Sequence, residues 1–397
     1  MKTRISVIGQ GYVGLPLAVA AAEAGFLVTG IDIDETKVKS IQNGISLIED
    51  VSSERLSKQI NLGRYTASRD FSVVSDSNLI LICVPTPLNL EQKPDLSYVL
   101  NSICEISKYL KQNTLVILES TVEPGTTRNI VLPAILRESN LNIDQVELAF
   151  SPERIDPSNK IWSLENTPKI VSGINDKSRK RALEFYSKFI KTVISCDSPE
   201  IAETAKLLEN SFRLINISFI NEISIFCDIL GIDIHKVIAA AKTKPYGFMA
   251  FFPSLGAGGH CIPVDPIYLV NKSHEIGAPS NLIELAYKIN KEMPRYFVNK
   301  AEEKIGMLRG KKVLVVGVSY KPNVADTRDT PVKHLIKELE NKGALVSWHD
   351  DLVKEWKGEK SVTLSNNYDL AILATPHAYI DLTKLGDVPI LNPRGSI

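Results

Sequence analysis

Apolar runs of strand length alternate with stretches of helical period along the N-terminal part of the chain. Residues 5–8 are rich in β-branched side chains, residues 15–24 are rich in alanine, and residues 26–31 form a second apolar run that ends at Asp32. This order predicts a βαβ unit. Three later apolar runs continue the pattern, at residues 79–84, 115–118 and 146–150. We therefore expect a parallel sheet.

A similar pattern returns near the C-terminus. Residues 312–316 are apolar, Gly317 follows, residues 331–341 have a helical period, and residues 345–348 form the next apolar run. A single glycine at this turn lacks the glycine spacing of a dinucleotide-binding turn. The second copy is therefore predicted to bind something other than a dinucleotide.

A long amphipathic helix is predicted between the two copies. Pro199 after Ser198 suits the first helical position, and the helical period runs over residues 200–230 until Gly231. Its apolar face contains Ile215, Phe219, Ile223 and Phe226. This face suits packing within the chain and contact with a partner subunit equally.

The predicted fold class is α/β, with two Rossmann-like doubly wound parallel-sheet domains joined by a long central helix and a helical linker domain. A chain of 397 residues is longer than one ordinary domain. The predicted domains span residues 1–197, 198–300 and 301–397.

Charge and hydropathy narrow the classes of partner. The 46 basic and 46 acidic residues cancel, so the sequence has no electrostatic footprint for nucleic acid or for an anionic membrane. A compact anionic ligand held by a few local basic residues is still compatible with this balance. No run approaches the roughly 20 apolar residues of a membrane-spanning helix, and the chain enters a strand too early for a signal peptide. We predict a cytoplasmic protein.

The five cysteines are scattered and include no Cys-x-x-Cys pair. This argues against a disulfide framework and against a zinc site, and it indicates a reducing compartment. Cys261 lies in a segment with glycine at positions 256, 258 and 259. Glycine permits positive φ and lets a ligand approach the backbone closely, so the thiol is a candidate nucleophile. The alternative is a buried structural cysteine.

Residues 9–14 carry the spacing of a dinucleotide-binding turn. Glycines at 9, 11 and 14 follow a strand and open a helix, so a pyrophosphate fits at the helix N-terminus. Asp32 ends the next strand, where a carboxylate accepts ribose hydroxyls and repels a 2′-phosphate, which favours NAD over NADP. Lys37 suits a ribose contact and a solvated position equally. The alternative for the whole turn is a tight glycine turn without a ligand.

Three polar residues share one face of the predicted central helix. Glu203, Lys206 and Asn210 are spaced three and four residues apart. Because apolar residues flank Lys206, its ammonium could face a cleft and stabilise an oxyanion. A wet helix surface is the alternative.

Strand ends supply further candidates. Glu153 follows a predicted strand, where open parallel sheets place catalytic residues, and a surface salt bridge with a neighbouring basic residue is the alternative. Thr121 also follows a strand and could hydrogen-bond a cofactor or a water. Lys321 and Arg328 lie after the first strand of the second copy and could hold a diphosphate.

Together these residues resemble the nucleotide-sugar 6-dehydrogenase family, the UDP-glucose/GDP-mannose dehydrogenases, along essentially the whole chain. The matching motifs, in the family's order, are Gly9-x-Gly11-Tyr12-Val13-Gly14, Val84-Pro85-Thr86-Pro87, residues 119–127, Glu203-x-x-Lys206 with Asn210, Gly258-Gly259-His260-Cys261 and Asp326-Thr327-Arg328. The resemblance implies an N-terminal NAD domain, a helical dimerisation linker and a C-terminal domain for a UDP-sugar, in a homodimer or higher homo-oligomer.

The resemblance also implies a reaction. The C6 hydroxyl of the sugar is oxidised twice with two NAD+, and Cys261 forms first a thiohemiacetal and then a thioester that water releases. Two other classes remain open: a single-step tandem-Rossmann dehydrogenase in which Cys261 is structural, and a non-catalytic NAD-binding protein.

Roles for the polar residues follow from the same resemblance. Lys206 and Asn210 would stabilise oxygen anions. Asp265 and Thr121 would hold a water for proton transfer, and Glu153 would act as general acid or base. The expected cofactor contacts are Gly9, Gly11, Tyr12, Val13, Gly14, Asp32, Lys37, Pro85, Thr86, Thr121 and Arg328. The expected substrate contacts are Glu153, Arg154, Lys206, Asn210, Tyr246, Gly258 and Lys321.

The substrate is inferred from two segments. Residues 151–160 resemble members that oxidise UDP-N-acetylhexosamines, and residues 244–249 point the same way. The second segment lacks an arginine that UDP-glucose enzymes place there to reach the partner subunit's site. UDP-N-acetylglucosamine is favoured, with UDP-N-acetylmannosamine next and UDP-glucose as a further alternative.

Overall fold

The computed structural model describes residues 3–156, 159 and 161–395. Internal packing divides the chain into two compact units, Met1–Leu207 and Leu208–Ile397. The division falls inside α7 (Pro199–Leu230), the long helix predicted between the two sheets. The three finer domain boundaries, 1–197, 198–300 and 301–397, stay a prediction.

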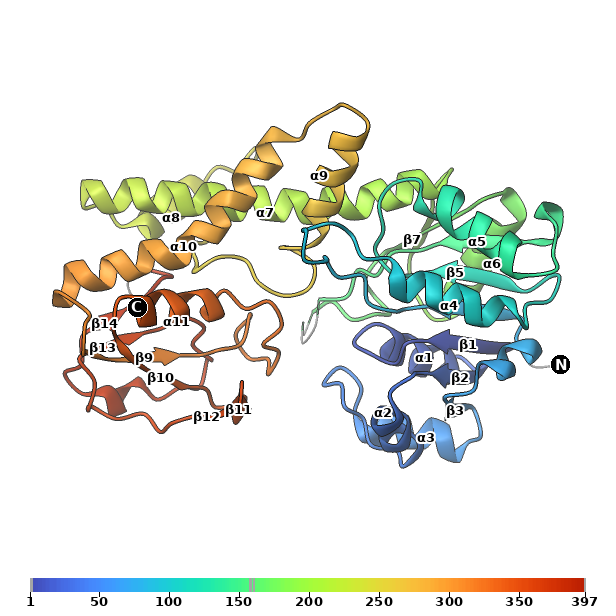
Figure 1. Cartoon of the computed structure of the whole chain (residues 1–397), viewed down its shortest axis with the longest axis horizontal. Helices are drawn as coiled ribbons and strands as arrows, with labels where there is room; N and C mark the ends of the chain where they lie inside the picture. Colours follow the sequence, from blue (N-terminus) through green and yellow to red (C-terminus); the bar gives the residue numbers. More distant parts are fainter. Residues whose placement is uncertain (1–2, 157–158, 160, 396–397) are drawn as a thin grey trace. The chain divides into compact units, whose positions relative to one another are not determined.

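The first unit is built on a sheet with the strand order β3-β2-β1-β4-β5-β6-β7-β8 (Figure 1). The strands are β1 (Arg4–Ile8), β2 (Leu27–Ile31), β3 (Tyr65–Ser68), β4 (Leu79–Ile82), β5 (Leu115–Leu118), β6 (Glu147–Phe150), β7 (Lys169–Gly173) and β8 (Val193–Ser195). The helices are α1 (Gly14–Glu23), α2 (Glu35–Gln42), α3 (Ser53–Asn61), α4 (Ser97–Ser107), α5 (Leu132–Glu138) and α6 (Asp176–Tyr186), with a π-helical turn, η2 (Thr127–Val131), before α5.

The central strands of this sheet are buried on both faces. Ile5 and Val7 of β1 join one apolar cluster, whereas Ile8 joins a second cluster together with Ile80 and Ile82 of β4. Successive side chains of a strand point to opposite faces, so a strand covered on both faces is mostly apolar, and the buried Ser6 of β1 is satisfied by a hydrogen bond with Ser77. This preference for apolar residues explains why short apolar runs predicted these strands.

The parallel direction ends at β7. Strand β6 pairs with β7 in antiparallel register, with Phe150 opposite Ser172, and β8 runs parallel to β7. Because β7 is reversed, its first residue, Lys169, lies at the edge where β4, β5 and β6 end. The sequence patterns did not predict β7, since its apolar run covers only residues 170–171.

The second unit contains a smaller parallel sheet with the order β10-β9-β13-β14 (Figure 1). Its strands are β9 (Lys312–Val316), β10 (Leu345–His349), β13 (Leu370–Ile372) and β14 (Ile390–Leu391), and β11 (Glu355–Trp356) with β12 (Glu359–Lys360) forms a separate antiparallel pair. The helices are α8 (Ile234–Lys242), α9 (Asp265–Glu275), α10 (Asn281–Ile305) and α11 (Val332–Asn341). The sequence analysis did not predict α10, which contains Pro294. The predicted α/β class, with a long central helix, is confirmed.

Candidate functional site

The glycine turn after β1 has two glycines that the backbone requires and one that leaves space. A Cβ on Gly14 would lie 1.8 Å from the carbonyl oxygen of Gly9, and a Cβ on Gly9, which has φ +87°, would lie 2.7 Å from the carbonyl oxygen of Cys83. A Cβ on Gly11 would meet no described atom within 4 Å. Gly11 therefore offers an open stretch of backbone to a pyrophosphate, while Tyr12 and Val13 pack partly buried against the core before α1.

Asp32, directly after β2, ties this turn to the next strand. Its Oδ2 accepts hydrogen bonds from the backbone N–H of Gln10 and from Nζ of Lys37, each at 2.8 Å, and its Oδ1 accepts from the N–H of Asp34 at 3.0 Å. Lys37 thus pairs with the carboxylate and is not simply solvated. The open glycine and the buried carboxylate at adjacent strand ends fit the pyrophosphate and ribose of a dinucleotide.

Two neighbouring strand ends complete this edge of the sheet. Pro85 and Thr86 follow β4, and Thr121 follows β5, which pairs with β4. Ser120 Oγ donates to the carbonyl of Val84 at 2.7 Å and joins the two segments. Because β4 also pairs with β1, Pro85 and Thr86 follow the strand that neighbours the strand before the glycine turn.

The polar face of α7 is buried in the first unit, so the alternative of a wet surface is wrong there. Lys206 Nζ donates to the backbone carbonyl of Glu153 at 2.7 Å and lies 3.4 Å from its Oε2. Glu203 accepts from the N–H groups of Gly125 and Thr127 at 2.6 and 2.8 Å, and burial raises its pKa against these hydrogen bonds. Glu153 is likewise a buried partner of Lys206 and not a surface ion pair.

Arg154 has a structural partner in the same unit. Its Nη1 donates to the carbonyl of Pro168 at 2.6 Å, just before β7. Residues 157, 158 and 160, which entered the substrate interpretation and include Lys160, lie outside the described residues.

Lys169, a charged residue beside Glu153, was missed by the sequence analysis, and its partner Glu119 entered that analysis only as part of the motif at residues 119–127. Lys169 Nζ lies 2.7 Å from Oε2 of Glu119 and 3.1 Å from the carbonyl oxygen of Pro152. The reversed direction of β7, which brings Lys169 to this edge, has no local signal in the sequence.

In the second unit, Cys261 precedes the first turn of α9. Its carbonyl accepts from the N–H groups of Val264 at 3.2 Å and of Asp265 at 2.8 Å. The carboxylate of Asp265 in turn accepts from Nδ2 of Asn210 at 2.6 Å, and both side chains are buried. Two predicted catalytic residues, Asn210 and Asp265, are therefore in direct contact one turn from the cysteine.

The glycines before Cys261 have a packing role that differs from the predicted ligand access. A Cβ on Gly258 would lie 2.8 Å from Cδ of Pro331 and 2.9 Å from the carbonyl oxygen of Asp329. Gly259, with φ +86°, would place a Cβ 2.9 Å from the ring of Tyr320. These positions need glycine because the loop after β9 lies against them.

That loop carries the predicted phosphate contacts. Arg328 binds Asp326 through Nε at 2.9 Å and Nη2 at 2.5 Å, and Lys321 is half-buried in the same loop. Burial and the nearby Arg328 guanidinium lower the pKa of His260. Tyr246, a predicted substrate contact, is 72% exposed and has Lys244 Nζ 5.0 Å from its ring centre.

Within the described ranges there is no cluster of three or more potential metal ligands. None of the helices described there has the length and apolar character needed to cross a membrane.

Three consecutive segments of the chain match models of one protein family. The NAD binding domain of the UDP-glucose/GDP-mannose dehydrogenase family matches residues 3–190, its central domain matches residues 200–292, and its UDP binding domain matches residues 314–390. The predicted family resemblance and the choice of NAD as cofactor are confirmed.

Individual relatives cover nearly the whole chain. UDP-N-acetyl-D-mannosamine dehydrogenase of Methanococcus maripaludis is 33% identical over 400 residues, covering 98% of this chain and 90% of that protein. UDP-N-acetyl-D-glucosamine 6-dehydrogenase of Salmonella typhi is 33% identical over 390 residues, covering 95% and 90%. The solved UDP-D-ManNAc dehydrogenase of Pyrococcus horikoshii has a TM-score of 0.90 at 29% identity, covering 99% of this chain and 95% of that one.

The Asp32 contacts predict cofactor discrimination. The wild type should bind NADPH at least about tenfold more weakly than NADH, because the carboxylate repels a 2′-phosphate. In Asp32→Ala, Lys37 remains without this carboxylate. The ratio of the dissociation constant for NADPH to that for NADH should therefore fall to less than about threefold, mainly through weaker NADH binding. Fluorescence titration with both reduced cofactors measures the two dissociation constants.

Lys37→Ala is the matched control for Asp32→Ala. It retains the Asp32 carboxylate, so it should keep or increase the preference for NADH over NADPH. Equal binding of NADH and NADPH by the wild type would remove Asp32 from the ribose site.

Proposed function

The chain belongs to the UDP-glucose/GDP-mannose dehydrogenase family, and from this premise we propose that it oxidises C6 of a UDP-N-acetylhexosamine to the carboxylate. It is an NAD-dependent nucleotide-sugar dehydrogenase. The observation that supports oxidation to the carboxylate is the position of the Asn210–Asp265 pair, one turn from Cys261. Cys261 is the nucleophile, and the pair places polar groups next to its segment. A four-electron oxidation needs such a nucleophile, whereas a single-step dehydrogenation does not.

The proposed reaction consumes one water. NAD+, when bound, accepts a hydride in each of the two oxidation steps. Cys261 adds to the intermediate aldehyde, so a bond forms between Sγ and C6 and the thiol proton is transferred to the aldehyde oxygen. After the second oxidation, water attacks the thioester, the bond between Sγ and C6 breaks, and the thiol recovers a proton. The alcohol, two NAD+ and one water give the carboxylate, two NADH and three protons.

Each buried polar pair has a proposed role. The Lys206 ammonium, next to Glu153, stabilises developing negative charge on oxygen, and Glu153 transfers protons in the thioester steps. Asn210 stabilises an oxyanion, and Asp265 with Thr121 holds a water. Burial of Glu153, Lys206, Asn210 and Asp265 supports their roles, since charge stabilisation is stronger where water is excluded.

The proposed substrate is UDP-N-acetylglucosamine, with UDP-N-acetylmannosamine as the nearest alternative and UDP-glucose as a further one. Relatives named for both N-acetylhexosamines have the same 33% identity to this chain, so residues 151–160 and 244–249 carry the preference. A site that binds an acetamido group leaves its polar partners unpaired when a hydroxyl replaces that group. A cytoplasmic location also remains our prediction, because a reactive thiol is kept reduced there.

A panel of UDP- and GDP-sugars assayed for NADH tests the function. We expect two NADH per sugar, a 6-carboxylate product with no accumulated aldehyde, and turnover of an N-acetylhexosamine that exceeds turnover of UDP-glucose. One NADH per sugar would support the single-step alternative, and absence of turnover with the whole panel would support the non-catalytic one. Faster oxidation of UDP-glucose would defeat the substrate assignment.

Cys261→Ser tests the covalent step. A hydroxyl is a weaker nucleophile and its ester hydrolyses more slowly, so steady-state NADH formation should fall by at least about 10³-fold while sugar and NAD+ still bind. Calorimetric titration measures the two binding steps. Cys227→Ser is the matched control, since Cys227 is a buried cysteine of the apolar cluster beside α8. Full activity in Cys261→Ser would assign Cys261 a structural role.

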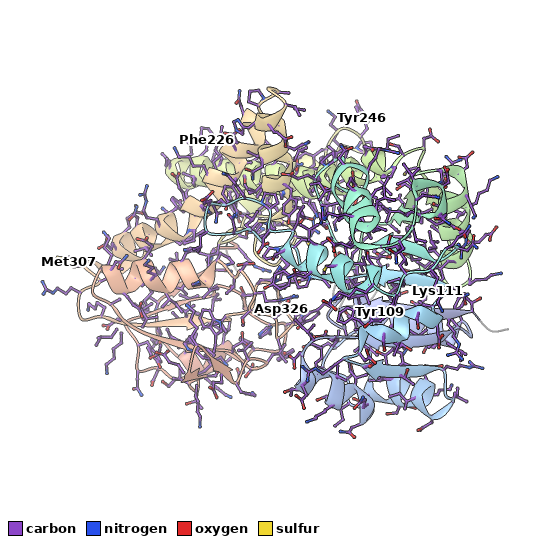
Figure 2. All side chains as sticks on the ribbon, turned by 45° about the vertical axis from the view of Figure 1, so that its right-hand side comes forward. Tyr109, Lys111, Phe226, Tyr246, Met307 and Asp326 are labelled. Atoms are coloured by element: carbon purple, nitrogen blue, oxygen red, sulfur yellow. The ribbon has the colours of Figure 1, made fainter. Side chains whose placement is uncertain are left out.

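We also propose a homodimer or higher homo-oligomer built on α7. Phe212, Phe219 and Phe226 recur every seven residues and are 44%, 54% and 59% exposed. Figure 2 shows Phe226 on this helix and Tyr246 on the segment after α8. Side chains seven residues apart lie on one face of a helix, so the phenylalanines form one apolar stripe suited to a second copy.

Phe219→Asp should shift the protein toward monomer, because the contact would then bury an unpaired charge. Sedimentation velocity measures the change. Arg213→Asp places the same group on a different side of α7 and should leave the association intact. A monomeric wild type at micromolar concentration would exclude the stripe as a dimer contact.

A further inference from the structure

We propose that Lys169, held by Glu119, is a positioning residue that fixes the turn carrying Glu153 so that Glu153 meets Lys206. This inference rests on the proposed function, in which Glu153 and Lys206 act on the sugar. This role requires no contact of Lys169 or Glu119 with the substrate.

Two buried ammonium groups hold two successive carbonyl groups of one turn. Lys169 Nζ lies 3.1 Å from the carbonyl oxygen of Pro152, and Lys206 Nζ lies 2.7 Å from the carbonyl oxygen of Glu153. Fixing both carbonyl groups sets the orientation of the intervening peptide, and with it the direction of the Glu153 side chain. The backbone N–H of Ile155 also donates to Oε1 of Glu153, and we infer that the 3.4 Å separation of Lys206 Nζ from Glu153 Oε2 depends on both lysines as well.

Because the charged groups around this segment are buried, each needs a partner of opposite charge. The side chains of Lys169 and Glu119 are 6% and 1% exposed, and those of Lys206 and Glu153 are 5% and 11% exposed. Two lysines and two glutamates give no net charge, so each ammonium has a carboxylate partner. Removing one partner of a buried pair leaves an uncompensated charge, which is strongly destabilising.

Glu119 is itself held in place from a second side. The hydroxyl of Tyr186, at the end of α6, donates to Oε1 of Glu119, while Lys169 binds Oε2. Lys169 Nζ also lies 4.9 Å from the centre of the Tyr186 ring. Burial raises the pKa of Glu119 and the pKa of Tyr186, and Lys169 opposes the rise at Glu119. The ammonium therefore favours the charged form of the carboxylate, against the effect of burial.

The sheet topology explains why Lys169 can do this. Glu119 follows β5 and Pro152 follows β6, so both lie at the carboxyl edge of parallel strands. Only a strand that begins at this edge can place its first side chain there, and β7 begins there because it is antiparallel to β6. A cavity at this edge is lined by Val13 of the glycine turn together with Glu119, Glu153 and Lys169.

The experiment separates positioning from stability with two variants of the whole 397-residue chain. Lys169→Met removes the ammonium and leaves Glu119 without its cation, so both kcat and thermal stability should fall. The double variant Glu119→Gln with Lys169→Met removes both charges, and the melting temperature should recover because an uncharged pair of similar volume is tolerated. Its kcat should stay about 10- to 100-fold below wild type, since a displacement of about 1 Å at a catalytic group has this effect.

Arg181→Met is the matched control. Arg181 pairs with Glu147, the first residue of β6, so this variant breaks an ion pair at the opposite end of the same strand. It should lower the melting temperature and leave kcat within about twofold of wild type. The dissociation constant for NADH should be unchanged in all three variants, because the glycine turn and Asp32 are intact.

Two outcomes overturn the proposal: wild-type kcat in the double variant, or an equal loss of kcat in Arg181→Met. A crystal structure of the double variant supplies a readout that does not depend on turnover. We expect the distance from Lys206 Nζ to Glu153 Oε2 to increase by about 1 Å. If the wild type oxidises no UDP-sugar, the proposed function fails, while a displaced Glu153 would still support positioning and an unmoved one would reject it.

Discussion

The contact between the Lys206 ammonium and the turn at Glu153 is the interaction on which the first unit's site depends. It joins the end of β6 to α7 and buries a cation that must be compensated. One turn earlier on the same helix, Glu203 accepts two backbone N–H groups from the segment after β5. The helix therefore holds two adjacent strand ends with two opposite charges. Each contact satisfies backbone groups in the segments that follow these strands.

Each sheet has a carboxylate directly after the strand that neighbours its glycine-containing turn, and the two carboxylates have different partners. Asp32 follows β2 and accepts the N–H of Gln10 in the glycine turn, and Asp350 follows β10 and accepts the N–H of Val318 in the corresponding turn, each at 2.8 Å. Asp350 also accepts from His377 at 2.9 Å. Burial alone would raise the pKa of Asp350, but these hydrogen bonds lower it. The hydrogen bonds of Asp350 therefore stabilise its own loop, within the segment that matches the UDP binding domain of the family.

In the second unit, the segment before Cys261 packs tightly against the loop after β9, which contains Lys321 and Arg328. Gly258 and Gly259 admit Tyr320 at distances that a Cβ would not allow, and Arg328 lies near enough to His260 to contribute to its lowered pKa. A shift of either loop therefore disturbs the other, because close-packed groups are not independently deformable. The glycines that suggested space for a ligand serve this packing first.

The sequence by itself determined the elements whose signal is local. Glycine spacing at 9, 11 and 14 and the carboxylate at Asp32 predicted the cofactor turn. Short apolar runs predicted β1, β4 and β5, because a strand covered on both faces has few polar positions. Family motifs located the catalytic candidates. Only the tertiary structure decided that β7 is reversed and that Lys169 reaches Glu119 across fifty residues. Strand direction and charge pairing depend on contacts between distant segments, and one residue's neighbours in the chain do not encode them.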